Sequence, residues 1–73
     1  MCDENQKVLA IAAEHIRKNL PYSTHVLSLP SVVADNGDMW TVTYQLPPDT
    51  AGGTPVLTID KTTCKVVRVL RYQ

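Results

Sequence analysis

The stretch Met39–Leu46 reads Met-Trp-Thr-Val-Thr-Tyr-Gln-Leu and decides the fold of this chain. Its large side chains alternate with smaller polar ones, so Trp40, Val42 and Tyr44 share one face of an extended backbone. Strict alternation of β-branched and aromatic residues is typical of a half-buried strand. Because the aromatic face would supply much of a small core, we expect a central strand of a sheet, with its threonines nearer water.

Composition and charge are typical of a small globular domain. The chain has 73 residues, 44% of them apolar, and its seven basic and seven acidic side chains cancel. Zero net charge argues against nucleic acid as the main partner, because phosphate contacts need clustered positive charge. No apolar run is long enough to span a membrane. We predict a single domain over residues 1–73, with a core small enough to need support from a disulfide, a dimer or further sequence.

Residues 4–19 predict an amphipathic helix before the central strand. Apolar residues recur every four positions and form one stripe: Val8, Ala12, Ile16 and Leu20. Asp3 is expected to cap the helix, with Gln6 completing a capping box. Pro21 is expected to end it, because the residue before a proline avoids the α region.

Three further strands are expected around the central one. The first spans Tyr22–Ala34 and is interrupted by Pro30, which cannot donate to a ladder. The turn Asp35–Asp38 contains Asn-Gly, which supplies the positive φ that hairpins require. Strands over Pro55–Asp60 and Lys65–Tyr72 complete the set. The sequence therefore predicts an α+β fold, with one N-terminal helix packed on a curved four-stranded antiparallel meander sheet.

The last predicted strand is apolar on both faces, with Val67 and Val69 on one face and Val66 and Leu70 on the other. A strand of this kind needs cover on both faces, and native proteins rarely leave such an edge bare. Pairing with a second copy would cover Val67 and Val69 and favours a homodimer. The basic side chains along the strand would instead protect a monomer by charge.

Residues that carry chemistry are scattered along the chain. His15 and His25 have no cysteine or carboxylate at metal-ligand spacing, and the turn Asp35–Asp38 lacks the ligand spacing and final glutamate of a calcium loop. No glycines frame a serine nucleophile, and Gly52-Gly53 lacks the lysine of a phosphate-binding loop. We therefore expect no enzyme, no catalytic residue, no cofactor and no metal ion.

Two segments are candidates for contacting a protein partner. The loop Pro47–Thr54 is long for a hairpin and combines rigid prolines with flexible glycines, as recognition loops do. Arginines on the last strand could bind an acidic partner, although a solvated strand face is the alternative. The predicted partner-binding residues are Asp49, Thr50, Gly52, Gly53, Arg68 and Arg71.

The two cysteines, Cys2 and Cys64, leave redox state and location open. In a cytoplasmic protein they would be free thiols, whereas in an exported protein they could pair and close a long loop. Cys2 also stands where a lipid-modified cysteine would begin a mature lipoprotein after removal of its leader. The sequence is compatible with the cytoplasm and, if Cys2 is a lipoprotein remnant, with the periplasm or cell envelope.

An ordered set of short motifs runs through the second half of the chain: Trp40-x-Val42, Leu46-Pro47, Gly52-Gly53 and Ile59-Asp60-Lys61-x-x-Cys64-Lys65-Val66. This set resembles the NTF2-fold immunity proteins, small bacterial α+β proteins with a cystatin-like sheet around a helix. The resemblance implies a non-enzymatic protein that binds and neutralises a bacterial toxin. The family usually has glycine at the position of Cys64, because the turn there requires a positive φ.

The segment Ile59–Val66 is also similar to the turn of PepSY-type domains, Ile-Asp-x-x-Thr-Gly-x-Val, with Cys64 again in place of glycine. This second resemblance implies an envelope module that inhibits or regulates a peptidase, and we retain it as the alternative function. A small NTF2-like enzyme is a third possibility. The predicted sheet offers no acid–base pair to line a deep pocket, which is what such an enzyme would need.

Overall fold

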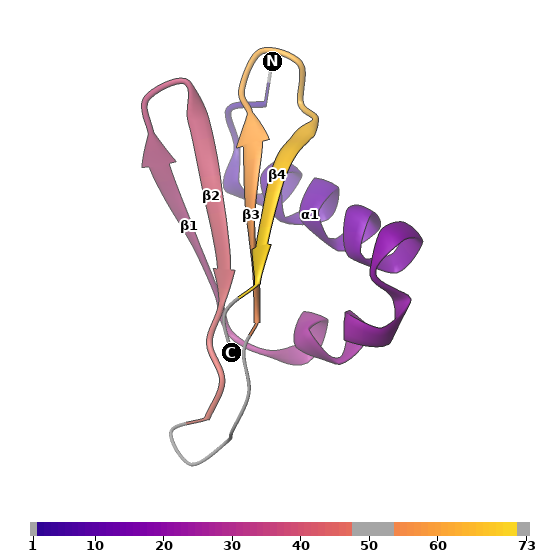
Figure 1. The fold of residues 1–73 in the computed structure, drawn as a ribbon. Coiled ribbons are helices and arrows are strands. Elements are labelled where there is room, and N and C mark those ends of the chain that lie inside the picture. Colours follow the sequence, from indigo (N-terminus) through magenta and orange to yellow (C-terminus); the bar gives the residue numbers. More distant parts are fainter. Residues whose placement is uncertain (1, 48–53, 72–73) are drawn as a thin grey trace.

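The protein folds as a helix followed by a four-stranded antiparallel meander (Figure 1). The computed structural model describes residues 2–47 and 54–71, and of Arg71 the backbone alone. In chain order the elements are α1 (Asn5–Asn19), the 3₁₀ helix η1 (Pro21–Ser28), β1 (Ser31–Asn36), β2 (Met39–Tyr44), β3 (Pro55–Asp60) and β4 (Val66–Arg71). The predicted α+β class and helix-plus-meander topology are confirmed. The predicted loop Pro47–Thr54 falls mostly outside the described residues.

The sheet has the order β1-β2-β3-β4, so β2 is central, as its sequence predicts. The β1–β2 hairpin is closed by a tight turn in which Asn36 is paired with Met39. Gly37 has φ +78°, and its amide donates to Oδ1 of Asp35 at 3.1 Å. The Asn-Gly turn therefore forms where it is expected and fixes the register of the hairpin.

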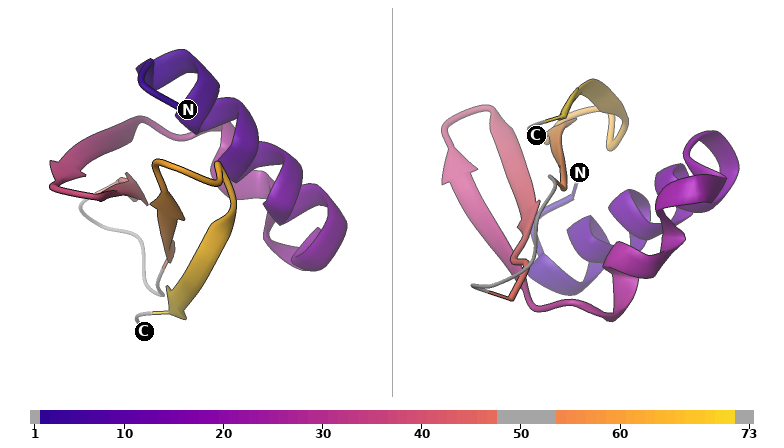
Figure 2. Two further views of the ribbon diagram at one scale, coloured as in Figure 1. Left: turned by 90° about the horizontal axis from the view of Figure 1, so that it is seen from above. Right: turned by 60° about the horizontal axis from the view of Figure 1, so that its bottom comes forward.

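The core lies between α1 and one face of the sheet. The stripe of Val8, Ala12 and Ile16 is fully buried, and it packs in one cluster with Val42 and Leu57 of the sheet. Both views of Figure 2 place α1 and η1 on the same side of a curved sheet. The opposite face carries the threonines of β2 and β3 and is covered by no other described element.

The start of α1 differs from the prediction. The N-cap is Glu4 rather than Asp3, and its side chain makes no capping hydrogen bond. The predicted capping box of Asp3 and Gln6 is therefore wrong. A disulfide and a backbone hydrogen bond hold the neighbouring Cys2 at the sheet, and this tertiary anchoring replaces local capping at the entry to the helix.

The segment Pro21–Ser28 is a 3₁₀ helix, and the strand predicted over Tyr22–Ala34 is wrong in its first half. Pro21 stands in the first turn, where its missing N–H costs nothing. The hydroxyls of Thr24 and Ser28 bond locally, to the carbonyls of Pro21 and His25. Such local bonds give the backbone an alternative to a ladder, and strand β1 begins only after Pro30.

A β-bulge in β4 changes which side chains face the core. Thr58 pairs with Arg68 and Ile59 pairs with Val66, so Val67 is an extra residue without a partner in β3. Val66 and Val69 consequently both pack against the core, whereas Val67 is 53% exposed. The predicted alternation, with Val67 and Val69 on one face, is wrong for this reason.

The N-terminal segment is held against the turn between β3 and β4. Cys2 and Cys64 form a disulfide with a Cα–Cα distance of 5.6 Å, and the Cys2 amide donates to the Lys61 carbonyl at 3.1 Å. The sequence left open whether the two cysteines pair, and the structure shows that they do. Among the described residues, no helix is long and apolar enough to cross a membrane.

Candidate binding groove

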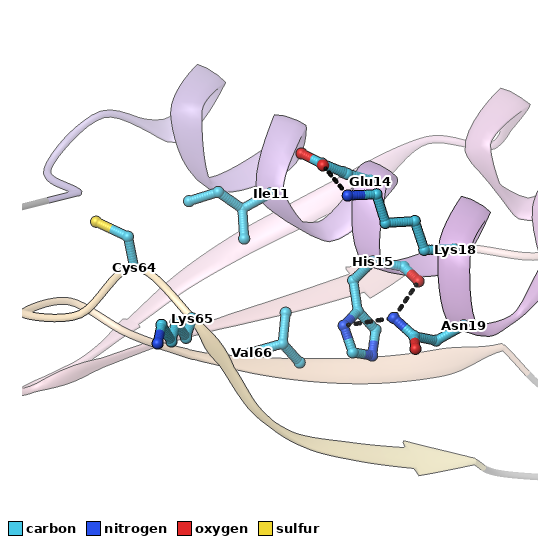
Figure 3. A pocket seen from close by; sticks show the side chains of 8 residues that line it. All are labelled: Ile11, Glu14, His15, Lys18, Asn19, Cys64, Lys65 and Val66. Carbon is cyan, nitrogen blue, oxygen red and sulfur yellow. Dashed lines mark hydrogen bonds and ion pairs between the residues drawn. The ribbon is translucent and has the colours of Figure 1, made fainter.

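A groove of about 340 Å³ runs between α1 and the start of β4 (Figure 3). Its lining extends from Cys64, which precedes β4, to Asn19 at the end of α1. Its lining combines one face of the helix with the two residues before β4 and the first residue of that strand: Ile11, Glu14, His15, Lys18, Asn19, Cys64, Lys65 and Val66. We refer to this hollow as the α1–β4 groove.

The helical spacing places one row of side chains along the groove. Ile11, His15 and Asn19 follow each other at intervals of four residues, and residues at this spacing share one face of a helix. Figure 3 shows Ile11 and His15 pointing toward the strand, and Val66 pointing toward the helix. Ile11 and Val66 are half-buried against the core, so the groove has an apolar floor.

The helix side of the groove has a polar rim. Nζ of Lys18 lies 2.7 Å from Oε1 of Glu14, and both side chains are mostly exposed. The hydrogen bond from Lys18 lowers the pKa of Glu14, while the same contact raises the pKa of Lys18. Exposed pairs of this kind contribute little to stability. The Asn19 side chain also donates to the His15 carbonyl at 3.2 Å, which holds the end of the rim in place.

Two basic residues at or next to β4 have no counter-charge in the described part of the chain. Lys65 and Arg68 are exposed, and neither forms an ion pair with another residue in the described part of the chain. Lys65 lines the groove itself, whereas Arg68 projects from the opposite face of the sheet, beside Thr58. The two charges therefore flank β4 on its two sides.

A second hollow, of about 430 Å³, lies around Trp40, next to the turn between β3 and β4. Three of its side chains are held by bonds within the hollow. The indole N–H donates to the Cys2 carbonyl at 2.7 Å, and Nζ of Lys61 bonds to Oδ1 of Asp35 at 2.6 Å and lies 4.4 Å from the centre of the indole ring. We call Cys2, Asp35, Trp40, Lys61 and Cys64 the N-terminal clamp. Despite its larger volume, we treat this hollow as the weaker candidate for a partner, because its indole and its lysine are already bonded to neighbouring groups.

Of the six predicted partner-binding residues, the structure describes the side chain of Arg68 alone. Asp49, Thr50, Gly52 and Gly53 lie outside the described residues, as does the side chain of Arg71. Arg68 is described and exposed, but it does not line the α1–β4 groove.

The helix side of the groove was missed from the sequence. One signal was available: Ile11 is a large apolar residue beside the stripe that begins at Val8, so the apolar face of α1 is wider than the sheet alone requires. In the described part of the chain, no group of three or more His, Cys, Asp and Glu side chains is placed to hold a metal ion.

Comparison with known proteins assigns the chain to one family. The family model described as NTF2 fold immunity protein matches residues 7–73. No curated protein and no solved structure matches the chain closely enough to count as a relative. The match covers the helix as well as the motif-bearing strands, and it agrees with the first of the two resemblances in the sequence. The chain belongs to the family of NTF2 fold immunity proteins.

Proposed function

We propose that this protein is a non-catalytic binding module that neutralises a bacterial toxin by occluding it, with the α1–β4 groove as part of the contact surface. Membership in a family of immunity proteins is the observation that carries the proposal. The groove supports it, because an apolar floor of Ile11 and Val66 within a polar rim is the usual anatomy of a protein-binding site.

The groups that border the groove favour binding over chemistry. Glu14 and Lys18 are exposed and paired with each other, which is typical of a solvated rim. A catalytic acid or base is instead usually set apart by burial or by a like charge that shifts its pKa toward the working pH. The carboxylate and ammonium here are each held further into their charged forms.

A survival assay tests the proposed function. A toxin gene found next to the gene for this chain would be expressed from an inducible promoter, with and without the full chain. We expect survival only in the presence of the chain, and a stable complex of the two purified proteins in size-exclusion chromatography. Equal killing in both strains, with no complex, would contradict the proposal.

The loop Pro47–Thr54 belongs to the same proposal as a second contact region. Its residues Asp49, Thr50, Gly52 and Gly53 are candidates on sequence grounds, since recognition loops often combine proline and glycine. Shortening the loop by four residues should weaken toxin binding and leave the thermal midpoint nearly unchanged. A large fall in the midpoint would show that the loop is packed structure.

The disulfide supports an extracytoplasmic site of action. Disulfides persist in oxidising compartments and are rare in the cytosol. A lipid thioether on Cys2 would use the sulfur atom that here bonds to Cys64, so lipid attachment and the disulfide exclude each other in one molecule. Maleimide labelling of denatured protein from the native host should find no free thiol in the chain. Two free thiols would place it in a reducing compartment.

An envelope location would also suit the alternative function, a PepSY-like module that inhibits or regulates a peptidase. The disulfide is the observation in its favour. The survival assay separates the two functions. A chain that inhibits a neighbouring peptidase but gives no protection against the toxin would favour the alternative.

A further inference from the structure

The strand β4 is one edge of the sheet. Among the described elements it pairs with β3 and with no other strand, so its second side presents backbone N–H and C=O groups without ladder partners. An edge of this kind is a template for another extended chain, and several peptide-binding domains use it for that purpose. The α1–β4 groove lies beside this edge, where side chains of an added strand would enter it.

The bulge at Val67 sets what the two sides of the edge can accept. Toward the helix, β4 presents Val66 and Val69, and the groove adds Ile11. Toward the opposite face it presents Arg68, which has no counter-charge in the described part of the chain. Side chains alternate along a strand, so the segment that fits would place apolar residues toward α1 and acidic residues beside Arg68.

We propose that β4 accepts an extended segment of the protein partner as a fifth strand, and that this segment alternates apolar residues facing the α1–β4 groove with acidic residues facing Arg68. The proposal rests on the proposed function for the identity of the partner as a toxin. Lys65, directly before β4, adds a second positive charge at the groove and makes the edge selective for acidic segments.

A second copy of the chain fits this edge less well. Antiparallel pairing of two β4 strands about their middle would bring the two copies of Arg68 next to each other, because Arg68 lies close to the centre of Val66–Arg71. Like charges on adjacent strands are destabilising. A second copy, as in the homodimer that the sequence favours, remains the competing occupant of the β4 edge.

Peptide titration of the full, oxidised chain tests the proposal. The probes are two eight-residue peptides, one alternating valine with glutamate and one alternating valine with lysine. Both would be titrated into isotopically labelled protein and followed by NMR. We expect the glutamate peptide to bind at least tenfold more tightly, with shift changes concentrated in residues 64–71. Equal binding of both peptides, no binding of either, or shifts centred elsewhere would overturn the proposal.

Backbone pairing is tested with methylated peptides. In a strand, alternate amides point to the same side, so methylating all glutamate amides or all valine amides blocks one edge of the peptide at a time. One of the two methylated peptides should lose binding at least tenfold while the other retains it. Equal affinity of both for the protein would show that binding does not involve strand addition.

Charge reversal provides the matched variants. Lys65→Glu combined with Arg68→Glu should reverse the preference, so that the lysine peptide binds more tightly. Lys7→Glu makes the same type of change at an exposed residue of α1 that does not line the groove, and it should leave both affinities within twofold. An unaltered preference in the double variant would contradict the assignment.

Two controls separate this inference from the rest of the account. Sedimentation of the unliganded chain should give a monomer, and a dimer that dissociates when the glutamate peptide is added would assign the edge to a second copy instead. If the toxin binds and protection is observed but the shifts lie away from β4, the inference fails and the proposed function stands. If the peptide binds at β4 but no protection is observed, the proposed function fails.

Discussion

The N-terminal clamp and the α1–β4 groove meet at Cys64 and differ in how the lysines next to the β3–β4 turn are paired. In the clamp, the Trp40 indole donates to the Cys2 carbonyl, Lys61 bonds to Asp35, and a disulfide joins Cys2 to Cys64. In the groove, Lys65 has no ion pair in the described part of the chain, and the neighbouring β4 edge has no second strand. The clamp stabilises the fold, whereas the groove retains groups that a partner can engage.

This difference follows from the size of the chain. For a chain of 73 residues, the usual value per residue gives a net stability of about 4–11 kcal/mol. One covalent bond and a few buried contacts can therefore hold a large share of that stability in a single place. Substitutions in the clamp should act on folding, and substitutions along the groove should act on binding. The predictions below test this division.

The largest effect is expected from removing the disulfide. Cys2 and Cys64 are separated by 62 residues, and closing a loop of that length stabilises a protein by about 4 kcal/mol on the chain-entropy model. Replacing both cysteines by serine should lower the free energy of unfolding in urea by about that amount and leave the variant marginally folded. A loss below about 1 kcal/mol would mean that the rest of the clamp holds the segment without the bond.

A smaller loss is expected from Trp40→Ala. Trp40 is half-buried against the core, so its loss should cost about 3 kcal/mol, near the lower end for tryptophan truncation. Trp40→Phe is the matched control, because it keeps a ring in place and removes the indole donor to Cys2. Its cost should be about 1–2 kcal/mol. Equal costs for the two variants, measured by urea unfolding, would show that the ring itself contributes little.

The next effect concerns the backbone at Cys64. Its φ of +61° is in the left-handed region, which costs a residue other than glycine about 1–2 kcal/mol. In a Cys2→Ser background, where no disulfide can form, Cys64→Gly should be about 1 kcal/mol more stable than Cys64→Ser. Thermal or urea unfolding of the two variants measures the difference. A more stable serine variant would contradict a strained turn at this position.

The smallest effect is a pKa shift in the clamp. The hydrogen bond from Lys61 is the main cause that holds the pKa of Asp35 below its ordinary value of 3.8, and the Gly37 amide adds to it. Since the unfolded chain titrates at the ordinary value, this contribution to stability is present above that pH and is lost as the pH falls through the lower, folded pKa. Lys61→Met should raise the Asp35 pKa, and Lys7→Met should leave it unchanged in a carboxyl NMR titration. An unaltered Asp35 pKa in Lys61→Met would remove Lys61 as the cause.

The sheet was predictable where local patterns and turn chemistry agree. The alternation from Trp40 to Tyr44 and the Asn-Gly turn fix β2 and the hairpin, and residues Pro55–Asp60 form β3 as expected. The positive φ at Cys64 was also indicated, because the related turn uses glycine there. In each case the determinant is a residue and its immediate neighbours.

Features that depend on distant parts of the chain could not be predicted. The residues of η1 carry an apolar alternation like that of a strand, and local hydroxyl bonds together with the burial of Val26 decide against it. The bulge at Val67 shifts the phase of β4 without any marker in the sequence. The α1–β4 groove exists only because β4 is placed beside Ile11. The choice between a disulfide and free thiols likewise depends on the distance between Cys2 and Cys64 in the fold.

The most direct test of the central claim is amide hydrogen exchange of the full, oxidised chain, alone and bound to the proposed toxin partner. The account predicts that binding slows exchange in β4, residues Val66–Arg71, and along the groove side of α1 around Ile11 and His15. Exchange around Trp40 should change little. Protection confined to the N-terminal clamp or to the free edge of β1, with β4 unaffected, would contradict the assignment of the binding surface.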